Sequence, residues 1–120
     1  MALESINLSH IGDVQQVNVN ITDDSITTLV EEEYGQRIFV YRLVISSNLA
    51  AKFTLRSGNT NDIFSMHGGA RWGHGEYSES RLPLYSTNDG EALTIQQLTQ
   101  DTIDANVYIQ YAYVTSINEE

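Results

Sequence analysis

Residues 37–47 form the apolar run that most constrains how this chain folds. A strand with one face in water alternates apolar and polar residues, so a strand that is apolar on both faces requires protein on both sides. Only Arg42 interrupts the run. The segment therefore predicts a central strand of a sheet whose second face is also covered. By simple alternation, the two faces carry Ile38, Val40 and Val44 on one side, and Phe39, Tyr41, Leu43 and Ile45 on the other.

Further extended segments follow along the chain, separated by turn-forming residues. Val, Ile, Thr and Tyr dominate the apolar runs, and no segment has a helical period. Residues 47–49 predict a short turn that joins the central strand to the next one as a hairpin. The predicted strands are residues 14–22, 26–33, 37–47, 51–57, 62–67, 82–85, 91–98 and 105–116.

This spacing of strands predicts the fold class. About eight strands, some ten residues apart, are typical of an all-β, single-domain antiparallel β-sandwich, and that number suits a jelly roll. Residues 68–75 contain four of the eight glycines, so we expect a long surface loop there. Pro83, the only proline, favours a strand start or a sheet edge. We expect residues 1–22 to form an N-terminal arm plus the first strand, residues 23–116 the jelly roll, and residues 117–120 a short acidic tail.

Residues 105–116 are also apolar on both faces, with Gln110 as the clearly polar exception. Because no helix is predicted, a neighbouring subunit is the most economical cover for such strands, and loops or the N-terminal arm are the alternative. Tyrosine is enriched in subunit interfaces, since it combines an apolar ring with a polar tip. We expect Arg42 to find a carboxylate partner, either within the chain or across a subunit boundary. The predicted interface residues are Tyr41, Arg42, Tyr108, Tyr111 and Tyr113.

Composition excludes several classes of function. Sixteen acidic residues against six basic ones give a net charge of −10, which repels nucleic acid and anionic lipid. The chain has no cysteine, so thiolate catalysis and cysteine-ligated metal sites are excluded. We find no secretory signal and no apolar window long enough to span a membrane. We therefore expect no nucleic-acid or membrane partner, and a protein made and kept in a cytoplasm-like compartment.

The candidate chemical sites are few. His67 and His74, with the remote His10, match no usual zinc spacing, although a three-fold axis could gather copies of one histidine. Trp72 is either a binding anchor or a residue that caps the end of the sandwich. The chain has no nucleophile elbow, Walker loop or H-E-x-x-H motif. We therefore predict a protein that is not an enzyme and needs no cofactor.

The order of these motifs resembles a family of viral proteins. An arginine-flanked strand (residues 37–44) precedes a strand that ends in Ser-Gly (residues 53–58) and a Gly-Gly segment (residues 68–69). A Leu-Pro-Leu stretch (residues 82–84), Gly-Glu-Ala-Leu-Thr-Ile (residues 90–95) and a tyrosine-rich last strand (residues 107–114) follow. Over residues 34–116, this sequence is similar to the small jelly-roll decoration, or cement, proteins of tailed bacteriophages.

The resemblance implies a homotrimer on the outer capsid surface of a virion, made in the host cytoplasm and bound to the major capsid protein. There it would stabilise contacts between capsomers. Related modules serve in phage tails or fibres, where a loop would bind a host glycan. Loop contacts would then be Arg71, Trp72, His74 and Tyr77. We expect the arm to contact the capsid or a neighbouring subunit through Leu3, Ile6, Leu8 and Ile11.

Overall fold

The computed structural model of the chain describes residues 12–69, 71–78 and 82–115, and these contain nine β-strands and no helix. The first five strands are β1 (Gln15–Ile21), β2 (Thr27–Val30), β3 (Gln36–Ser47), β4 (Ala51–Ser57) and β5 (Asn61–Gly68). The others are β6 (Trp72–Tyr77), β7 (Tyr85–Ser86), β8 (Leu93–Gln97) and β9 (Ala105–Thr115).

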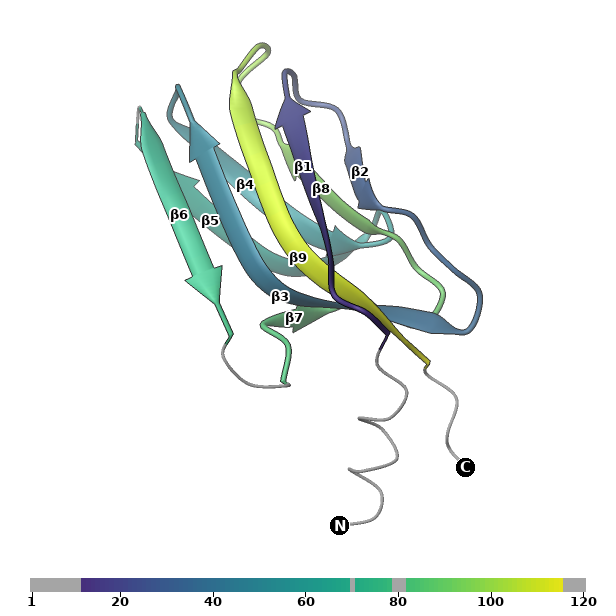
Figure 1. Cartoon of the computed structure of the whole chain (residues 1–120). Coiled ribbons are helices and arrows are strands. Elements are labelled where there is room, and N and C mark those ends of the chain that lie inside the picture. Colours follow the sequence, from purple (N-terminus) through teal and green to yellow (C-terminus); the bar gives the residue numbers. More distant parts are fainter. Residues whose placement is uncertain (1–11, 70, 79–81, 116–120) are drawn as a thin grey trace.

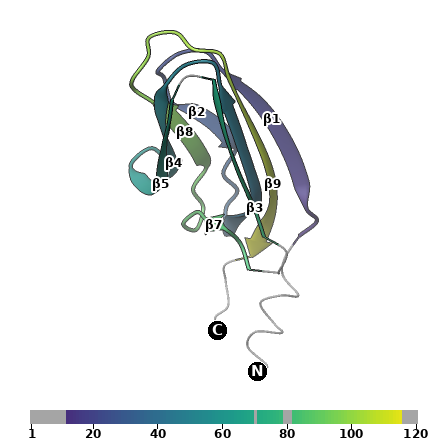
Figure 2. The same ribbon diagram turned by 90° about the vertical axis from the view of Figure 1, so that its left-hand side faces the viewer.

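The strands form two antiparallel sheets packed face to face, as Figures 1 and 2 show. Sheet A has the order β1-β9-β3-β6, and the short β7 also pairs with β3. Sheet B has the order β2-β8-β4-β5. If β7 is set aside, the eight remaining strands have the jelly-roll order, in which consecutive strands change sheet except at the β4–β5 hairpin. The predicted fold is confirmed, and β1 belongs to the sandwich.

The hydrophobic core lies between the two sheets. Sheet B contributes the fully buried side chains of Phe53 and Leu55 from β4 and of Leu93 from β8. The central strands β3 and β9 supply the facing layer of aliphatic side chains. Burial of this apolar surface is the main favourable term in folding. The side chains from sheet A are Ile38, Val40, Leu43, Ile45, Val107 and Ile109.

A β-bulge in β3 corrects the predicted assignment of its faces. The register against β9 shifts between Val40 and Arg42, so Tyr41 is the extra residue of the bulge. One extra residue lets side chains on either side of it return to the same face. As a result, Ile38 and Val40 share the buried face with Leu43 and Ile45, whereas simple alternation had separated them. Val44, predicted beside Ile38 and Val40, lies on the other face and is half-buried.

The predicted hairpin between residues 37–47 and 51–57 is wrong. β3 lies in sheet A and β4 in sheet B, so residues 48–50 cross from one sheet to the other. The side chain of Ser47 stabilises this crossing, because its hydroxyl donates to the carbonyl of Leu49 at 2.8 Å. The hairpin that does form joins β4 to β5 within sheet B.

The predicted long loop over residues 68–75 is also wrong. β5 continues to Gly68 in sheet B, and β6 begins at Trp72 in sheet A, so residues 69–71 are all that joins these two strands. In β6 the glycines alternate with larger residues: Trp72, His74 and Glu76 are half-buried, while Gly73, Gly75 and Tyr77 are exposed. Glycine content misled the prediction, because the period of two is that of an ordinary strand.

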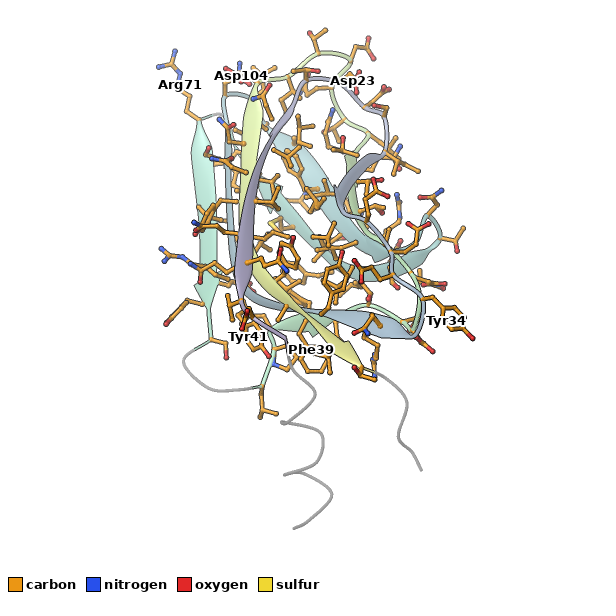
Figure 3. All side chains as sticks on the ribbon, turned by 45° about the vertical axis from the view of Figure 1, so that its right-hand side comes forward. Asp23, Tyr34, Phe39, Tyr41, Arg71 and Asp104 are labelled. Carbon is orange, nitrogen blue, oxygen red and sulfur yellow. The ribbon has the colours of Figure 1, made fainter. Side chains whose placement is uncertain are left out.

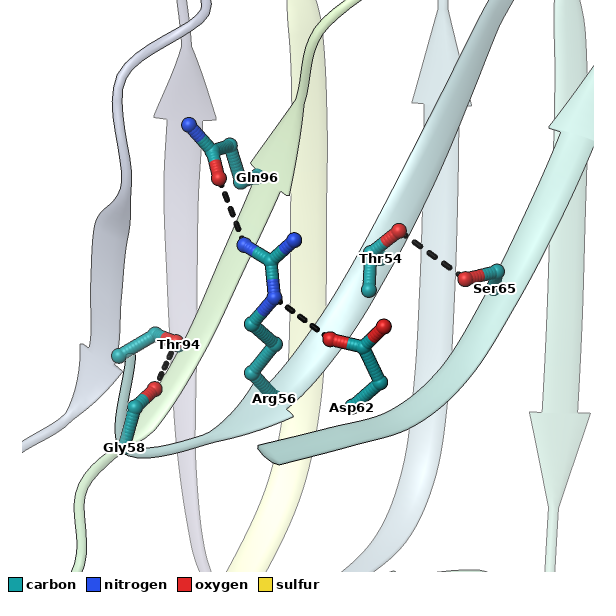
Figure 4. Close-up of polar contacts among 7 residues, drawn as sticks. All are labelled: Thr54, Arg56, Gly58, Asp62, Ser65, Thr94 and Gln96. Carbon is teal, nitrogen blue, oxygen red and sulfur yellow. Dashed lines mark hydrogen bonds and ion pairs between the residues drawn. The ribbon is translucent and has the colours of Figure 1, made fainter. Parts of the chain in front are cut away.

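The outer face of sheet B is polar, and its groups bond to one another (Figure 4). Arg56 donates to Asp62 at 2.7 Å and to Gln96 at 2.6 Å. The hydroxyls of Thr54 and Ser65 lie 3.0 Å apart on neighbouring strands. Polar groups that find partners within the chain make this face suited to water.

Candidate interaction surface

The outer face of sheet A differs from that of sheet B because it carries an arginine between two tyrosine rings. The guanidinium carbon of Arg42 lies 5.7 Å from the ring centroid of Tyr77 and 6.0 Å from that of Tyr108. These distances are typical of cation–π contacts. Among the described residues Arg42 has no ion pair, so the carboxylate partner we expected is replaced by two aromatic faces.

Hydrogen bonds extend this surface from β9 across to β1. The hydroxyl of Tyr108 donates to Oε1 of Gln16 at 2.5 Å and accepts from Nε2 of Gln110 at 2.9 Å. Cross-strand register explains the arrangement, since Gln16 is opposite Gln110 and Gln110 is opposite Arg42, which in turn is opposite Tyr77. One row across four strands therefore presents Gln, Gln, Arg and Tyr side by side.

Four of the five predicted interface residues divide between two environments. Arg42 and Tyr108 lie on the outer face, whereas Tyr111 and Tyr113 pack against the core cluster. The rings of Tyr111 and Tyr113 meet edge to face, with centroids 5.9 Å apart. The Tyr113 hydroxyl donates to the carbonyl of Glu31 at 2.7 Å. Burial, followed by the negative charge of Glu33, raises the pKa of Tyr113, so its hydroxyl stays protonated as a donor.

Tyr41, the fifth predicted interface residue, is 9% exposed and lies at one end of the sandwich with Phe39 (Figure 3). The two rings meet edge to face at 6.4 Å between centroids. Phe39 is opposite Ala112, which is fully buried, so apolar side chains occupy both faces of β3 and β9 at this end.

A second cluster lies on the inner side of β6, where the two sheets meet at the open side of the sandwich. Nε2 of His74 is 2.8 Å from Oε2 of Glu76, and the hydroxyl of Tyr85 donates to Oε1 of Glu76 at 2.5 Å. Phe64 of β5 stacks on Tyr85 with centroids 5.1 Å apart. Burial and the adjacent Glu76 carboxylate raise the pKa of Tyr85. The stacked ring pair thus joins β5 to β7, and the hydrogen bond from Tyr85 to Glu76 joins β7 to β6.

The four residues predicted as loop contacts are spread along β6. Arg71 lies at the end of the sandwich near Asp104 (Figure 3), whereas Tyr77 lies at the other end of the strand. A strand of this length separates them by about 20 Å. Trp72 packs against the core, edge to face with Phe53 at 5.8 Å between centroids. Of the two roles proposed for Trp72, the structure supports packing at the end of the sandwich.

Sequence reasoning missed Tyr85 as a partner of Glu76, and it did not recognise that His74 and Glu76 lie on one face of a strand. The signal was present in the strand-like period of residues 72–77, where every second residue is large and the others are glycine or Tyr77. His67 lies apart from this cluster, exposed on β5. His10 and the four arm residues Leu3, Ile6, Leu8 and Ile11 lie outside the described residues, as does the predicted tail at residues 117–120.

Residues 12–69, 71–78 and 82–115 contain no group of three or more histidine, aspartate or glutamate side chains placed to hold a metal ion. In the same ranges, no helix has the length and apolar character needed to cross a membrane.

No protein-family model matches the sequence, and no curated protein matches it either. A similar solved structure is that of *Bacillus* endospore appendages, described as a novel family of disulfide-linked pili. It is 9% identical, with a TM-score of 0.50 over 88% of this chain and 89% of that one. Also similar is the structure of the extra small virus of the prawn Macrobrachium rosenbergii, with 14% identity and a TM-score of 0.41 over 88% of this chain and 81% of that one. The capsid of cyanophage Pam1 is similar too, with 15% identity and a TM-score of 0.43 over 83% of each chain. At such identities the pilus protein shares the fold alone, and a chain without cysteine cannot share its disulfide linkage.

Proposed function

We propose that this protein is a non-enzymatic structural protein of a virus particle, a decoration protein that forms trimers on the outer shell and stabilises contacts between capsomers. One observation carries the proposal: sheet A presents Arg42 between Tyr77 and Tyr108, whereas the outer face of sheet B is polar and bonded to itself. Arginine and tyrosine are the residue types that contribute most to protein interfaces. A sandwich with one such face is suited to assembly through that face.

Sequence and charge add to this proposal. The order of motifs over residues 34–116 resembles phage decoration proteins, and the net charge of −10 suits the outside of a shell rather than its DNA-lined inside. Fold alone does not determine function, since jelly rolls serve many roles. The proposed partners are therefore further copies of the chain and the major capsid protein.

Replacing Arg42 by alanine tests the proposed subunit contact. We expect Arg42→Ala to weaken trimer association by about tenfold or more, because an interface arginine held by aromatic rings contributes about 1–2 kcal/mol. Sedimentation velocity over a range of concentrations measures the change. Arg56→Ala is the matched control, since Arg56 lies on the outer face of sheet B. A trimer that is intact and equally stable in Arg42→Ala contradicts the assignment.

The virion role is tested on particles. We expect this chain on a stained gel of purified particles in a copy number that matches capsid symmetry sites, and shells without it to break at lower temperature. Deletion of residues 1–12 should abolish binding to undecorated capsids if the arm makes the contact. A few copies per particle, with unchanged shell stability, would instead indicate a tail or fibre part.

A further inference from the structure

We infer that two copies of this chain join through the free edge of β6, pairing antiparallel about a two-fold axis into one continuous sheet. The inference is independent of the proposed virion role and of the three-fold contact, because it concerns the edge of sheet A rather than its face. Its basis is the unprotected edge of β6, two glycines that the chain's own packing does not require, and a self-complementary order of side chains.

Strand β6 has an open edge. Among the described strands it pairs with β3 alone, and this six-residue register has no bulge. Proteins usually protect edge strands with proline, lysine, bulges or shortness, since unpaired backbone groups accept another strand. The edges of sheet B show such protection: β2 has four residues and an irregular register, and the pairing of β5 with β4 shifts between Leu55 and Arg56. Residues 72–77 contain neither proline nor lysine.

The glycines of β6 are not needed by the chain itself. A Cβ atom at Gly73 would have the carbonyl oxygen of Ile45 as its nearest neighbour, at 3.6 Å. One at Gly75 would lie 3.9 Å from Cγ2 of Val44. Both are ordinary contacts, and neither glycine has a positive φ. Glycine inside a strand weakens it and often marks a place where another backbone or side chain approaches closely. Here such an approach would come from a second molecule.

The sequence of β6 is complementary to itself in one register. When Gly75 lies opposite Gly75 of a second copy, each Tyr77 lies opposite a Gly73 on the outer face. The Tyr77 ring is 59% exposed, and an aromatic ring across from a glycine covers the backbone that glycine leaves bare. On the inner face, His74 lies opposite Glu76, so the existing pair becomes a four-membered group with acid facing base.

Neighbouring registers are less favourable. Side chains directly opposite each other must share a face, so the register can shift only in steps that preserve the period of two. A shift one way places Glu76 opposite Glu76, and like charges directly opposite each other destabilise a strand pair. A shift the other way places His74 opposite His74 and each Glu76 opposite Trp72, so no carboxylate then lies opposite an imidazole. Side-chain chemistry therefore selects the register centred on Gly75.

Single cysteines test this register, because the natural chain has none. We expect Gly75→Cys to form a disulfide-linked dimer under mild oxidation, about tenfold faster than Lys52→Cys, an exposed control on β4 of sheet B. Opposite residues in an antiparallel pair have Cα atoms about 4.5–5.5 Å apart, within disulfide range. Gly73→Cys should cross-link quickly only when mixed with Tyr77→Cys. Cross-linking of Gly75→Cys at the control rate overturns the proposal.

A charge at the two-fold axis gives a second test that needs no oxidation. Gly75→Lys places two ammonium groups opposite each other in the pair, while its Cβ fits the monomer. By sedimentation velocity, we expect wild-type protein to have twice the mass of this variant, with thermal melting confirming that both are folded. Equal masses overturn the pairing. Arg42→Ala should leave the Gly75→Cys cross-link unchanged, so failure of the trimer and failure of the pair are distinguishable.

Discussion

At the scale of single residues, Gly68 shows how one missing side chain positions another. The ring of Trp72 lies where a Cβ atom on Gly68 would be: that atom would be 1.9 Å from Cδ2 and 2.2 Å from Cγ. No real pair of atoms comes so close, so any other residue displaces the indole. Trp72 in turn packs on Phe53 of sheet B, which links the end of β5 to the core.

We predict that Gly68→Ala lowers the free energy of unfolding by about 1–3 kcal/mol, the usual cost of overpacking a filled site. Trp72 is the only tryptophan, so its fluorescence should shift to the red as the ring moves toward water. Gly69→Ala is the matched control, because nothing lies within 4 Å of a Cβ atom there. Equal denaturation midpoints for the two variants contradict this account of Trp72.

Glu91 is a second single residue on which several turns depend. Its Oε1 accepts hydrogen bonds from Ser57 at 2.6 Å, from Asn61 at 3.2 Å and from Asn88 at 3.3 Å. These donors, with Ser57 first, hold the pKa of Glu91 below its ordinary value, although burial opposes them. A carboxyl whose pKa is lower in the folded state stabilises it when ionised.

We predict that Glu91→Gln destabilises the protein at neutral pH and that the difference from wild type disappears in acid. The contribution is fully present above the unfolded pKa, about 4.3, and is lost as pH falls through the lower folded pKa. Thermal melts of both proteins across this range measure it. A difference that stays constant with pH would mean that Glu91 acts through packing instead of through its charge.

At the scale of elements, the bulge at Tyr41 decides which side chains of β3 reach the core. Without it, the period of two would send Ile38 and Val40 to the face opposite Leu43 and Ile45. All four are at most 1% exposed, so the bulge is required for both ends of the strand to contribute to one core. Bulges of this kind also increase local twist, in keeping with the bend of β3 in Figure 1.

We predict that deletion of Tyr41 leaves a cooperatively folding protein, because Ile38, Val40, Leu43 and Ile45 then alternate with a regular period of two and stay on one face. Deletion of Val44 is the matched comparison: it sends Leu43 and Ile45 to opposite faces and should abolish cooperative folding, a loss of more than about 4 kcal/mol. Circular dichroism and thermal melting measure both outcomes. A Tyr41 deletion variant that is unfolded, or a Val44 deletion variant that melts like wild type, rules out the role given to the bulge.

At the scale of the whole molecule, the two sheets present different surfaces to their surroundings. On the outer face of sheet B, polar side chains hydrogen-bond to one another. Sheet A instead presents aromatic and cationic side chains and a free edge at β6. The net charge of −10 repels further copies at long range, so contacts between subunits must be short-range and specific. Assembly through the face of sheet A and pairing through its edge both meet that requirement.

The sequence by itself determined the strands and the fold class. Apolar runs rich in strand-forming residues, bounded by turn-forming residues, predicted β3, β4 and β9 at residues 37–47, 51–57 and 105–116, with bounds close to the observed ones, since strand propensity and turn chemistry are local properties. Only the tertiary structure decided which strands pair, because β3 and β4 cross between sheets and pairing depends on contacts distant in sequence. The strand at residues 72–77 was recorded in its local period of two and was obscured by its glycine content. The tertiary structure also placed the bulge at Tyr41 and the ring of Trp72 over Gly68, because both depend on register and packing, which no local pattern records.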